Sequence, residues 1–117
     1  MRKRVYIAGA YSANDAISVL NNMRTGMRMG TRVLVAGFAP FVPWLDYHFT
    51  LMQRNGEKVS LQDYYDYSMA WLEASDVVFA LPSCRHSKGA KAEIKRAMEL
   101  GIPIVYSFKE LIEWGGG

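Results

Sequence analysis

The sequence predicts an α/β fold in which a parallel sheet of four to five strands carries helices on both faces, as a three-layer sandwich. Short β-branched runs alternate with longer segments of helical periodicity along the 117 residues. The strand candidates are apolar at successive positions, which is typical of parallel strands buried on both faces. Half of the residues are hydrophobic, and the length suits a single core, so we expect one domain over residues 1–117.

The chain opens with a strand and a long helix. Arg4–Ala8 reads RVYIA, a β-branched run that predicts a buried first strand. Apolar residues at helical spacing predict a helix over Asp15–Gly30, and Ser12 or Asn14 can cap it. We expect this helix to continue through the next apolar residues and to break at Gly37.

The middle of the chain supplies a second strand and a second long helix. Phe38–Pro43 predicts a strand at the edge of the sheet, because Pro40 has no N–H group to donate to a neighbour. The aromatic segment Trp44–Asn55 predicts a short helix or an ordered loop, with a turn at Gly56. Leu61–Ala74 has the periodicity of a helix.

The last part of the chain repeats the alternation. Val77–Leu81 predicts the third strand, Ser87–Gly101 a helix that ends at its glycine, and Pro103–Tyr106 the fourth strand. Ser107 begins a last short helix, and Glu110 stands three residues later, the spacing of a capping box.

Three loops should meet at one edge of this sheet. Gly9–Ser12 follows the first strand, Trp44–His48 the second and Leu81–Gly89 the third. Ligands of open α/β sheets bind at the carboxyl ends of the strands, near the point where the strand order reverses. We therefore expect a ligand site among these loops.

Glu93 stands out within the helix over residues 87–101. On a helical wheel it falls among Gly89, Ala90 and Ala97, on the small, apolar face that should contact the rest of the protein. Two interpretations are open. The carboxylate pairs with a buried cation or donor and is structural, or the small residues leave a hollow beside it that holds a substrate.

Composition excludes several classes of protein. The single cysteine, Cys84, rules out an internal disulfide and favours a reducing compartment, and no apolar run is long enough for a membrane helix, so we expect a cytoplasmic protein without membrane contact. The net charge of +3 is compatible with a small anionic ligand, and no basic tail suggests polymeric nucleic acid. Cys84 and His86 are too few ligands for a metal site, and we expect neither metal nor organic cofactor.

The chain resembles the nucleoside 2-deoxyribosyltransferase-like family, which includes nucleoside 5′-monophosphate N-glycosidases. The resemblance rests on YIAGAYS near the start, DVVFALP in the middle and SKGAKAEIKRAMELGIP near the end, and it covers most of the chain. Its most specific part is the pattern S-x-G-x-x-x-E at Ser87, Gly89 and Glu93. The resemblance implies a flavodoxin-like fold.

The resemblance also implies roles for individual residues. Glu93 would be the nucleophile that attacks the anomeric carbon of the sugar. The family's tyrosine near the nucleophile matches Tyr6 directly, although Tyr11 is better placed to leave the strand end and Tyr6 could simply pack in the core. Asp76 is a further candidate catalytic residue, although an acid before a parallel strand is often only part of a solvated turn. The candidate substrate-binding residues are Gly9, Tyr11, Ser12, Asp46, Ser68, Ser87, Lys88 and Gly89; of these, Ser87 and Gly89 would bind phosphate or sugar, or only begin the helix.

The sequence departs from the family pattern at Ser68, where members usually carry an aspartate that handles the nucleobase or its proton. Several groups could take its place. Asp63 or Asp66 could do so through a shifted helix, or Asp46 or His48 could do so from the loop after the second strand. If none of them does, the protein does not catalyse the reaction.

Aromatic residues follow the second strand and begin the next long helix. They could stack on a nucleobase, fill the core or form a dimer interface. They are Trp44, Tyr47, Phe49, Tyr64 and Tyr65. Because the chain is small and aromatic-rich, and because the family assembles, we expect a homodimer or a larger homo-oligomer.

These observations predict an enzyme that cleaves or transfers the N-glycosidic bond of a (deoxy)nucleoside or its 5′-monophosphate, with Glu93 as nucleophile. The alternative is a non-catalytic nucleotide-binding module, such as a sensor, and the serine at position 68 favours it. A structural or interaction protein that only retains the fold is a third possibility.

Overall fold

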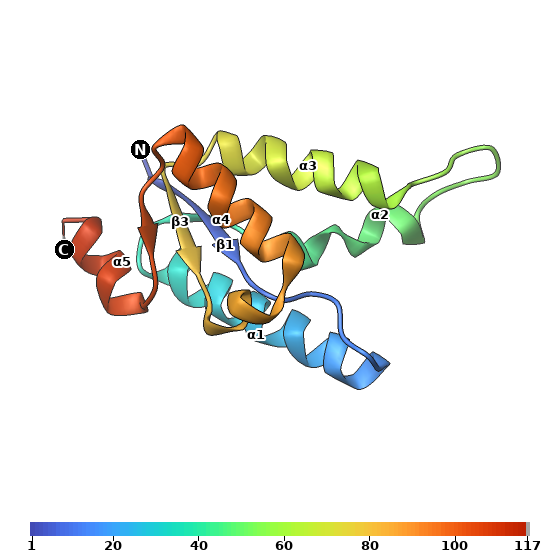
Figure 1. Ribbon diagram of the computed structural model, residues 1–117, viewed down its shortest axis with the longest axis horizontal. Coiled ribbons are helices and arrows are strands. Elements are labelled where there is room, and N and C mark those ends of the chain that lie inside the picture. The colour runs from blue at the N-terminus through green and yellow to red at the C-terminus, as the bar shows by residue number, and fades with distance from the viewer. Residues whose placement is uncertain (117) are drawn as a thin grey trace.

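The computed structural model describes residues 1–116 and shows the predicted α/β architecture, a flavodoxin-like arrangement of three layers (Figure 1). Two of its helices, labelled η1 and η2, are 3₁₀ helices. In chain order the elements are β1 (Arg4–Ala8), α1 (Ala16–Val35), β2 (Ala39–Phe41), η1 (Pro43–Tyr47), α2 (His48–Leu51), α3 (Leu61–Glu73), β3 (Val77–Ala80), η2 (Pro82–His86), α4 (Lys88–Leu100), β4 (Ile104–Val105) and α5 (Phe108–Trp114).

The four strands form one parallel sheet in the order β2-β1-β3-β4. β1 lies between β2 and β3, with Tyr6 opposite Phe41 on one side and Val78 on the other. The chain moves from β1 to β2 in one direction and then to β3 in the other, so the strand order reverses beside β1. β2 is an edge strand, which confirms the position predicted from Pro40.

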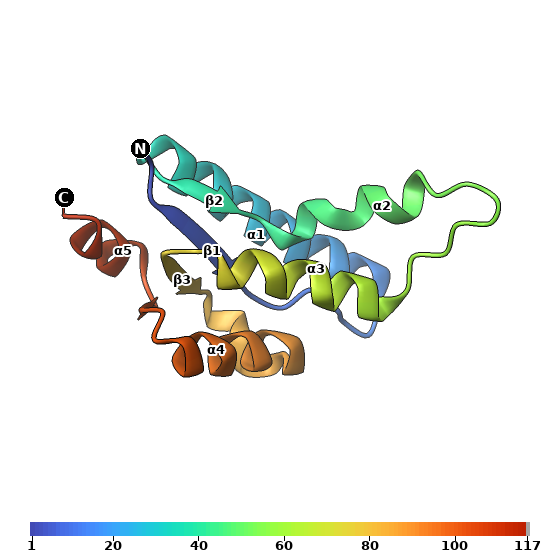
Figure 2. The ribbon, with the colours of Figure 1, turned by 90° about the horizontal axis from the view of Figure 1, so that it is seen from above.

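The two faces of the sheet hold two separate groups of core side chains. Val5 and Ile7 point to the face covered by α1 and α5, whereas Tyr6 and Ala8 point to the face covered by α3 and α4. Figures 1 and 2 show this division, with α3 and α4 side by side on their face. The alternation along β1 follows from the two-residue period of a strand.

Small residues bring α4 close to the sheet. Ala90 and Ala97 of α4 are fully buried and lie in the same core group as Ala80 of β3. The helical wheel therefore predicted the inner face of α4 correctly at these positions. Leu100 falls on the same arc of the wheel, which predicts that it faces the protein, but this last residue of α4 is 42% exposed.

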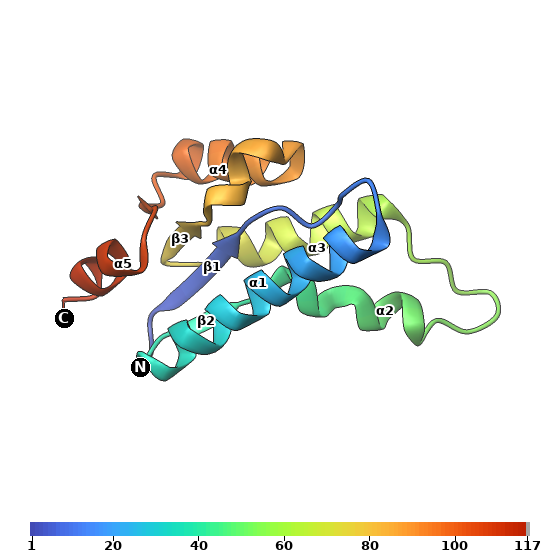
Figure 3. The same cartoon turned by 90° about the horizontal axis from the view of Figure 1, so that it is seen from below.

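Helix α1 is the long helix that the sequence predicts, and it ends just before Gly37, whose φ of +101° a side-chain-bearing residue rarely adopts. Its cap differs from the prediction. Asp15, rather than Ser12 or Asn14, is the N-cap, and its Oδ1 accepts a hydrogen bond from the Ser18 N–H at 2.8 Å. Figure 3 shows α1 running along β2.

Helices α3 and α5 both begin with a serine N-cap. Ser60 and Asp63 form a complete capping box at α3. At α5, Ser107 Oγ accepts from the Glu110 N–H at 3.1 Å, as predicted. The Glu110 carboxylate, however, accepts from the N–H of Tyr106, one residue before the cap, so only half of the predicted box forms.

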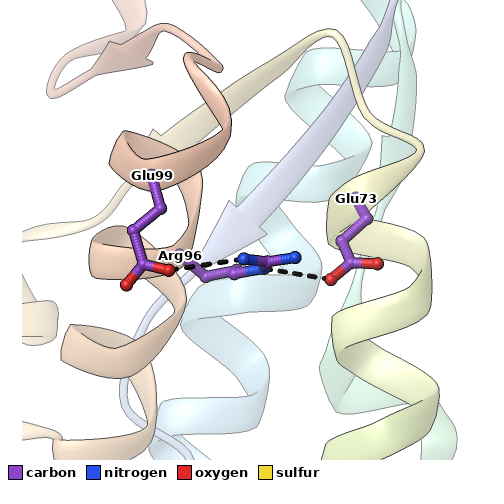
Figure 4. A network of polar contacts seen from close by, with 3 residues as sticks. All are labelled: Glu73, Arg96 and Glu99. Carbon is purple, nitrogen blue, oxygen red and sulfur yellow. Dashed lines mark hydrogen bonds and ion pairs between the residues drawn. The ribbon is translucent and has the colours of Figure 1, made fainter.

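A charged network on the surface connects the two helices of the α3/α4 face. Arg96 Nε lies 3.1 Å from Glu73 Oε2 of α3, and Arg96 Nη1 lies 3.3 Å from Glu99 Oε2 within α4 (Figure 4). All three side chains are partly exposed, so solvent weakens their attraction. The network fixes how α3 and α4 lie beside one another more than it adds stability.

The segment between α2 and α3 extends away from the rest of the protein, on the side opposite both chain ends (Figures 1–3). It turns at Gly56, with φ of +90°, as predicted. It gives the protein a longest extent of 47 Å against 27 and 25 Å in the other directions. In the part of the chain that is described, no helix is both long enough and apolar enough to cross a membrane.

Candidate active site

The centre of the candidate site is a contact between β1 and α4. Tyr6, in the middle of β1, is completely buried, and its phenolic O–H donates a hydrogen bond to Oε2 of Glu93. The ring of Phe41 stacks on the Tyr6 ring, with 5.4 Å between the centroids. Tyr6 is therefore both a core residue and the partner of the predicted nucleophile.

Burial changes the acidity of both partners. It raises the pKa of Glu93 to about 7, against the opposing effect of the Tyr6 hydrogen bond, so this carboxyl group exchanges its proton near neutral pH. Burial also raises the pKa of Tyr6, and the Glu93 carboxylate raises it further. Tyr6 consequently stays protonated and acts as a neutral hydrogen-bond donor.

A cation does not balance Glu93. The ion pairs among residues 1–116 join Arg4 to Asp76 and Arg96 to both Glu73 and Glu99. The sequence left either a buried cation or a hydrogen-bond donor open as the structural partner of Glu93. Within the described residues that partner is the Tyr6 hydroxyl, and neither an arginine nor a lysine pairs with Glu93. Without a cation, burial leaves the Glu93 carboxylate more basic than one in an ion pair.

Ser68 of α3 lies beside this pair, where its hydroxyl interacts with the Tyr6 phenol and lowers its pKa. The neighbouring acids of α3 do not replace it. Asp63 accepts from the Ser60 N–H in the capping box, and Asp66 is exposed and accepts from Gln62 Nε2 at 2.9 Å. The structure therefore places both acids at the surface of α3 and does not bring either to the Tyr6–Glu93 pair.

Asp46 is a buried acid of η1, which follows β2 at the carboxyl edge of the sheet. The residue is only 8% exposed. Burial raises its pKa, whereas hydrogen bonding by the Tyr11 hydroxyl and the charge of His48 lower it. The Asp46 charge in turn raises the pKa of both Tyr11 and Tyr6, so the three side chains share one environment.

The loop after β1 is fixed by Trp44 and by Ser83, which the sequence did not single out. Ser83 Oγ accepts from the Ala10 N–H at 3.0 Å, and Trp44 Nε1 donates to the Ala10 carbonyl at 3.0 Å. Gly9 is needed for this contact, because a Cβ there would lie 3.0 Å from Trp44 and 3.1 Å from Ser83. Gly9, a candidate substrate-binding residue, is thus packed closely against protein atoms.

The other aromatic candidates fall into different environments. Trp44 is buried in the core, one of the alternatives left open for it. Tyr47 and Tyr65 are exposed, whereas Phe49 and Tyr64 contact each other with centroids 6.4 Å apart. Aromatic contacts continue from Tyr6 to the end of α2 through Phe41, Tyr67 and Phe49.

The predicted phosphate or sugar ligands lie at the N-terminus of α4. Ser87 is its N-cap, and its Oγ accepts from the Ala90 N–H at 3.2 Å. Lys88 is exposed. Gly89 has open space where a Cβ would be, with Ser87 Oγ as the nearest atom at 3.9 Å. No contact between protein atoms explains the absence of a side chain at Gly89.

Two predicted residues lie outside this cluster. Asp76 precedes β3 at its amino end, where it accepts from the Arg4 N–H at 2.7 Å and lines a hollow of about 370 Å³ with Arg4 and Trp114. The length of a strand separates it from the carboxyl edge of the sheet, so the structure does not bring it to Glu93. Ser12 is exposed and only its carbonyl is in contact, with Asn22 Nδ2 at 3.5 Å.

Cys84 lies close to Glu93, but its thiol is structural. Its Sγ–H donates to the Ala8 carbonyl at 3.1 Å, and burial, followed by the Glu93 charge, raises its pKa to about 11. Such a thiol is a weak nucleophile at neutral pH. Within residues 1–116, no three side chains of histidine, cysteine, aspartate or glutamate gather as a metal site would require.

Comparison with known proteins places the chain in a family. Residues 3–107 match the family described as "Domain of unknown function (DUF7768)", and this range contains every candidate site residue from Tyr6 to Glu93. No curated protein matches the chain. Since the match extends over most of the sequence, the chain belongs to the DUF7768 family.

Proposed function

We propose that this protein cleaves or transfers the N-glycosidic bond of a (deoxy)nucleoside or its 5′-monophosphate. The observation that carries the proposal is the buried carboxylate of Glu93, held at one oxygen by the Tyr6 hydroxyl and balanced by no described cation. Its helix, α4, begins after β3 and η2, at the edge of the sheet where α/β proteins bind their ligands. The resemblance to the nucleoside 2-deoxyribosyltransferase-like family suggested the same residue independently.

The chemistry suits such a carboxylate. The transition state of N-glycoside cleavage resembles an oxocarbenium ion, which a nearby negative charge stabilises. The free oxygen of Glu93 would bond to C1′ while the C1′–N bond breaks and its electron pair leaves with the base. Water or a second base would then attack C1′ of the glycosyl ester and release the Glu93 carboxylate, with overall retention of configuration.

Tyr6 and the N-terminus of α4 would orient the reactants. The Tyr6 hydroxyl holds one oxygen of Glu93 so that the other is available for attack, without removing its charge. Ser87, Lys88 and Gly89 begin a helix of 13 residues, whose first N–H groups and dipole favour an anion. We assign the 5′-phosphate or a sugar hydroxyl to this end.

The direct test is to incubate the protein with the common deoxynucleosides and their 5′-monophosphates and to measure free base by chromatography. We expect base release in the wild type and its loss in Glu93→Ala. Glu99→Ala is the matched control, because Glu99 is on the same helix but on its exposed side. Base release that survives Glu93→Ala would exclude the nucleophile, and thermal stabilisation by nucleotides without release would indicate the binding module.

The homo-oligomer is part of the same proposal. Large apolar side chains are exposed along η1, α2 and the start of α3, where a second copy could cover them; they are Leu45, Leu51, Met52, Leu61 and Tyr65. Light scattering after size exclusion tests this, since a monomer at micromolar concentration would contradict it. We also propose a cytoplasmic location, which the unpaired thiol of Cys84 favours.

A further inference from the structure

Cleavage of an N-glycosidic bond leaves an electron pair on the base, and a poor leaving group must receive a proton as it departs. The groups nearest to Glu93 do not supply this proton. Ser68 has a hydroxyl, which is too weak an acid, and the Tyr6 hydroxyl is already donated to Glu93. The proposed reaction therefore needs another acid within reach of the same sugar.

The histidine after β2 is poorly placed for this task. His48 is exposed, its Nδ1 lies 3.1 Å from the Leu45 carbonyl, and its ring contacts Phe49 with centroids 4.0 Å apart. Asp63 and Asp66 are engaged at the surface of α3, as described above. Among the acids considered for the role, Asp46 remains.

The fold holds Asp46 in a fixed position. Pro43 starts η1 directly after β2, at the carboxyl edge of the sheet. Trp44 anchors this turn, because its Nε1 donates to the Ala10 carbonyl and its ring lies on Gly26 of α1, where a Cβ would come within 2.3 Å of it. The carboxyl group two residues later is buried, and it is close enough to Tyr11 of the loop after β1 for that hydroxyl to lower its pKa.

The surroundings of Asp46 keep it closer to its protonated form than a surface aspartate. Asp46 is 8% exposed, and this burial raises its pKa. The Tyr11 hydroxyl and the charge of His48 lower the pKa by smaller amounts. The reaction needs Asp46 protonated and Glu93 ionised at the same time. A bound substrate would favour both, because it removes remaining water from Asp46 and develops positive charge beside Glu93.

We propose that Asp46, positioned by Tyr11, is the general acid that protonates the departing base. This assignment rests on the proposed function. As Glu93 bonds to C1′, the C1′–N electron pair takes the proton of the Asp46 carboxyl group, and Asp46 becomes a carboxylate. In the second half, that carboxylate removes a proton from the water or the incoming base that attacks C1′, which restores both residues.

The test compares two leaving groups. One substrate is the deoxynucleoside or deoxynucleotide that the wild type cleaves fastest, and the other is its 4-nitrophenyl 2-deoxyriboside counterpart, whose acidic phenol departs as an anion without a proton. We expect Asp46→Asn to lose on the order of 100-fold or more in kcat/KM on the first substrate. On the second it should retain glycosyl-enzyme formation, observed as a burst of nitrophenolate.

The controls separate the possible failures. Asp66→Asn should lose neither reaction, and Glu93→Ala should lose both. An Asp46→Asn variant that loses both equally, or neither, would overturn the assignment while the proposed function stands. A wild type that cleaves neither substrate would overturn the proposed function and, with it, the role of Asp46.

A second variant tests the same proposal if Asp46→Asn fails to fold. Tyr11→Phe keeps the carboxyl group and removes only the hydroxyl that positions it, at a partly exposed site. We expect roughly a tenfold loss on the natural substrate, less than loss of the acid itself because the carboxyl group remains, and little change in the nitrophenolate burst. Equal effects on both substrates would overturn the positioning by Tyr11.

Discussion

The Tyr6 hydroxyl donates a hydrogen bond to Glu93 Oε2 across 87 positions of the sequence, from the central region of the sheet to the second turn of α4. The donor is neutral and fully buried, and burial raises the pKa of the carboxyl group to about 7. An arginine in this place would hold the carboxylate more strongly but would also cancel its charge. The pair therefore holds one oxygen of Glu93 without a cation, as the proposed nucleophile requires.

Replacing Tyr6 by phenylalanine should weaken catalysis without changing the fold. The Tyr6 hydroxyl lowers the pKa of Glu93, so its loss should raise that pKa above the wild-type value of about 7. A hydrogen bond to a charged group contributes roughly 1.5–3 kcal/mol, and we expect kcat/KM to fall by about 10- to 100-fold. Carbon NMR of the labelled glutamate carboxyl groups measures the pKa directly.

The control for this change is Tyr65→Phe, because Tyr65 is exposed on α3. It should change neither the Glu93 titration nor the rate. A Tyr6→Phe variant in which Glu93 titrates at the wild-type pH would show that the hydroxyl does not stabilise the carboxylate.

Glu93→Gln should stabilise the protein at alkaline pH. The carboxyl pKa is about 7 in the folded state against 4.5 for an ordinary glutamate, so folding favours the protonated form. The favourable contribution is complete below about pH 4.5 and is lost as the pH rises through 7. The uncharged glutamine avoids a cost on the order of 3 kcal/mol.

Urea unfolding at pH 5 and pH 8 measures this effect. We expect the variant and the wild type to differ little at pH 5, and the variant to be the more stable at pH 8. Glu99→Gln, which removes a surface charge from the same helix, should show no such pH dependence. A Glu93→Gln variant that is less stable at pH 8 would contradict the burial of an ionisable group at this site.

Much of this architecture follows from periodicity alone. The β-branched runs predicted the strands, Pro40 predicted the edge strand, and the helical wheel placed Glu93 on the inner face of α4. The same rules account for the position of Asp76. A residue that precedes a parallel strand lies at the amino edge of the sheet, whereas the loops expected to form the site all follow their strands.

Other features depend on contacts between distant segments, which one sequence does not reveal. Asp15, Ser12 and Asn14 are all good caps, and the path of the chain after β1 selects Asp15. Gly9 fits a ligand as well as it fits a tryptophan ring, until the position of Trp44 is known. The burial that distinguishes Asp46 from Asp63 and Asp66 likewise arises only in the folded protein.

Gly26→Ala should destabilise the protein through Trp44. The new Cβ would lie 2.3 Å from the indole ring, which is fully buried and cannot move without losing its hydrogen bond to the Ala10 carbonyl. Overpacking of this kind costs about 1–3 kcal/mol, against a small gain in helix propensity. Urea unfolding measures the loss, and unchanged stability would mean that the Trp44 site is loosely packed.

Gly89→Ala should separate stability from function. Open space surrounds the position and its φ is not in the left-handed region, so alanine should leave the free energy of unfolding unchanged or raise it by up to about 1 kcal/mol. If the glycine leaves room for the 5′-phosphate or the sugar, the added methyl group should raise KM roughly tenfold. Gly56→Ala is the control. Gly56 has a φ of +90° in the projecting turn, so alanine there should lower the stability of the protein and leave KM unchanged. A Gly89→Ala variant with wild-type KM for nucleosides and monophosphates alike would move the binding site away from the N-terminus of α4.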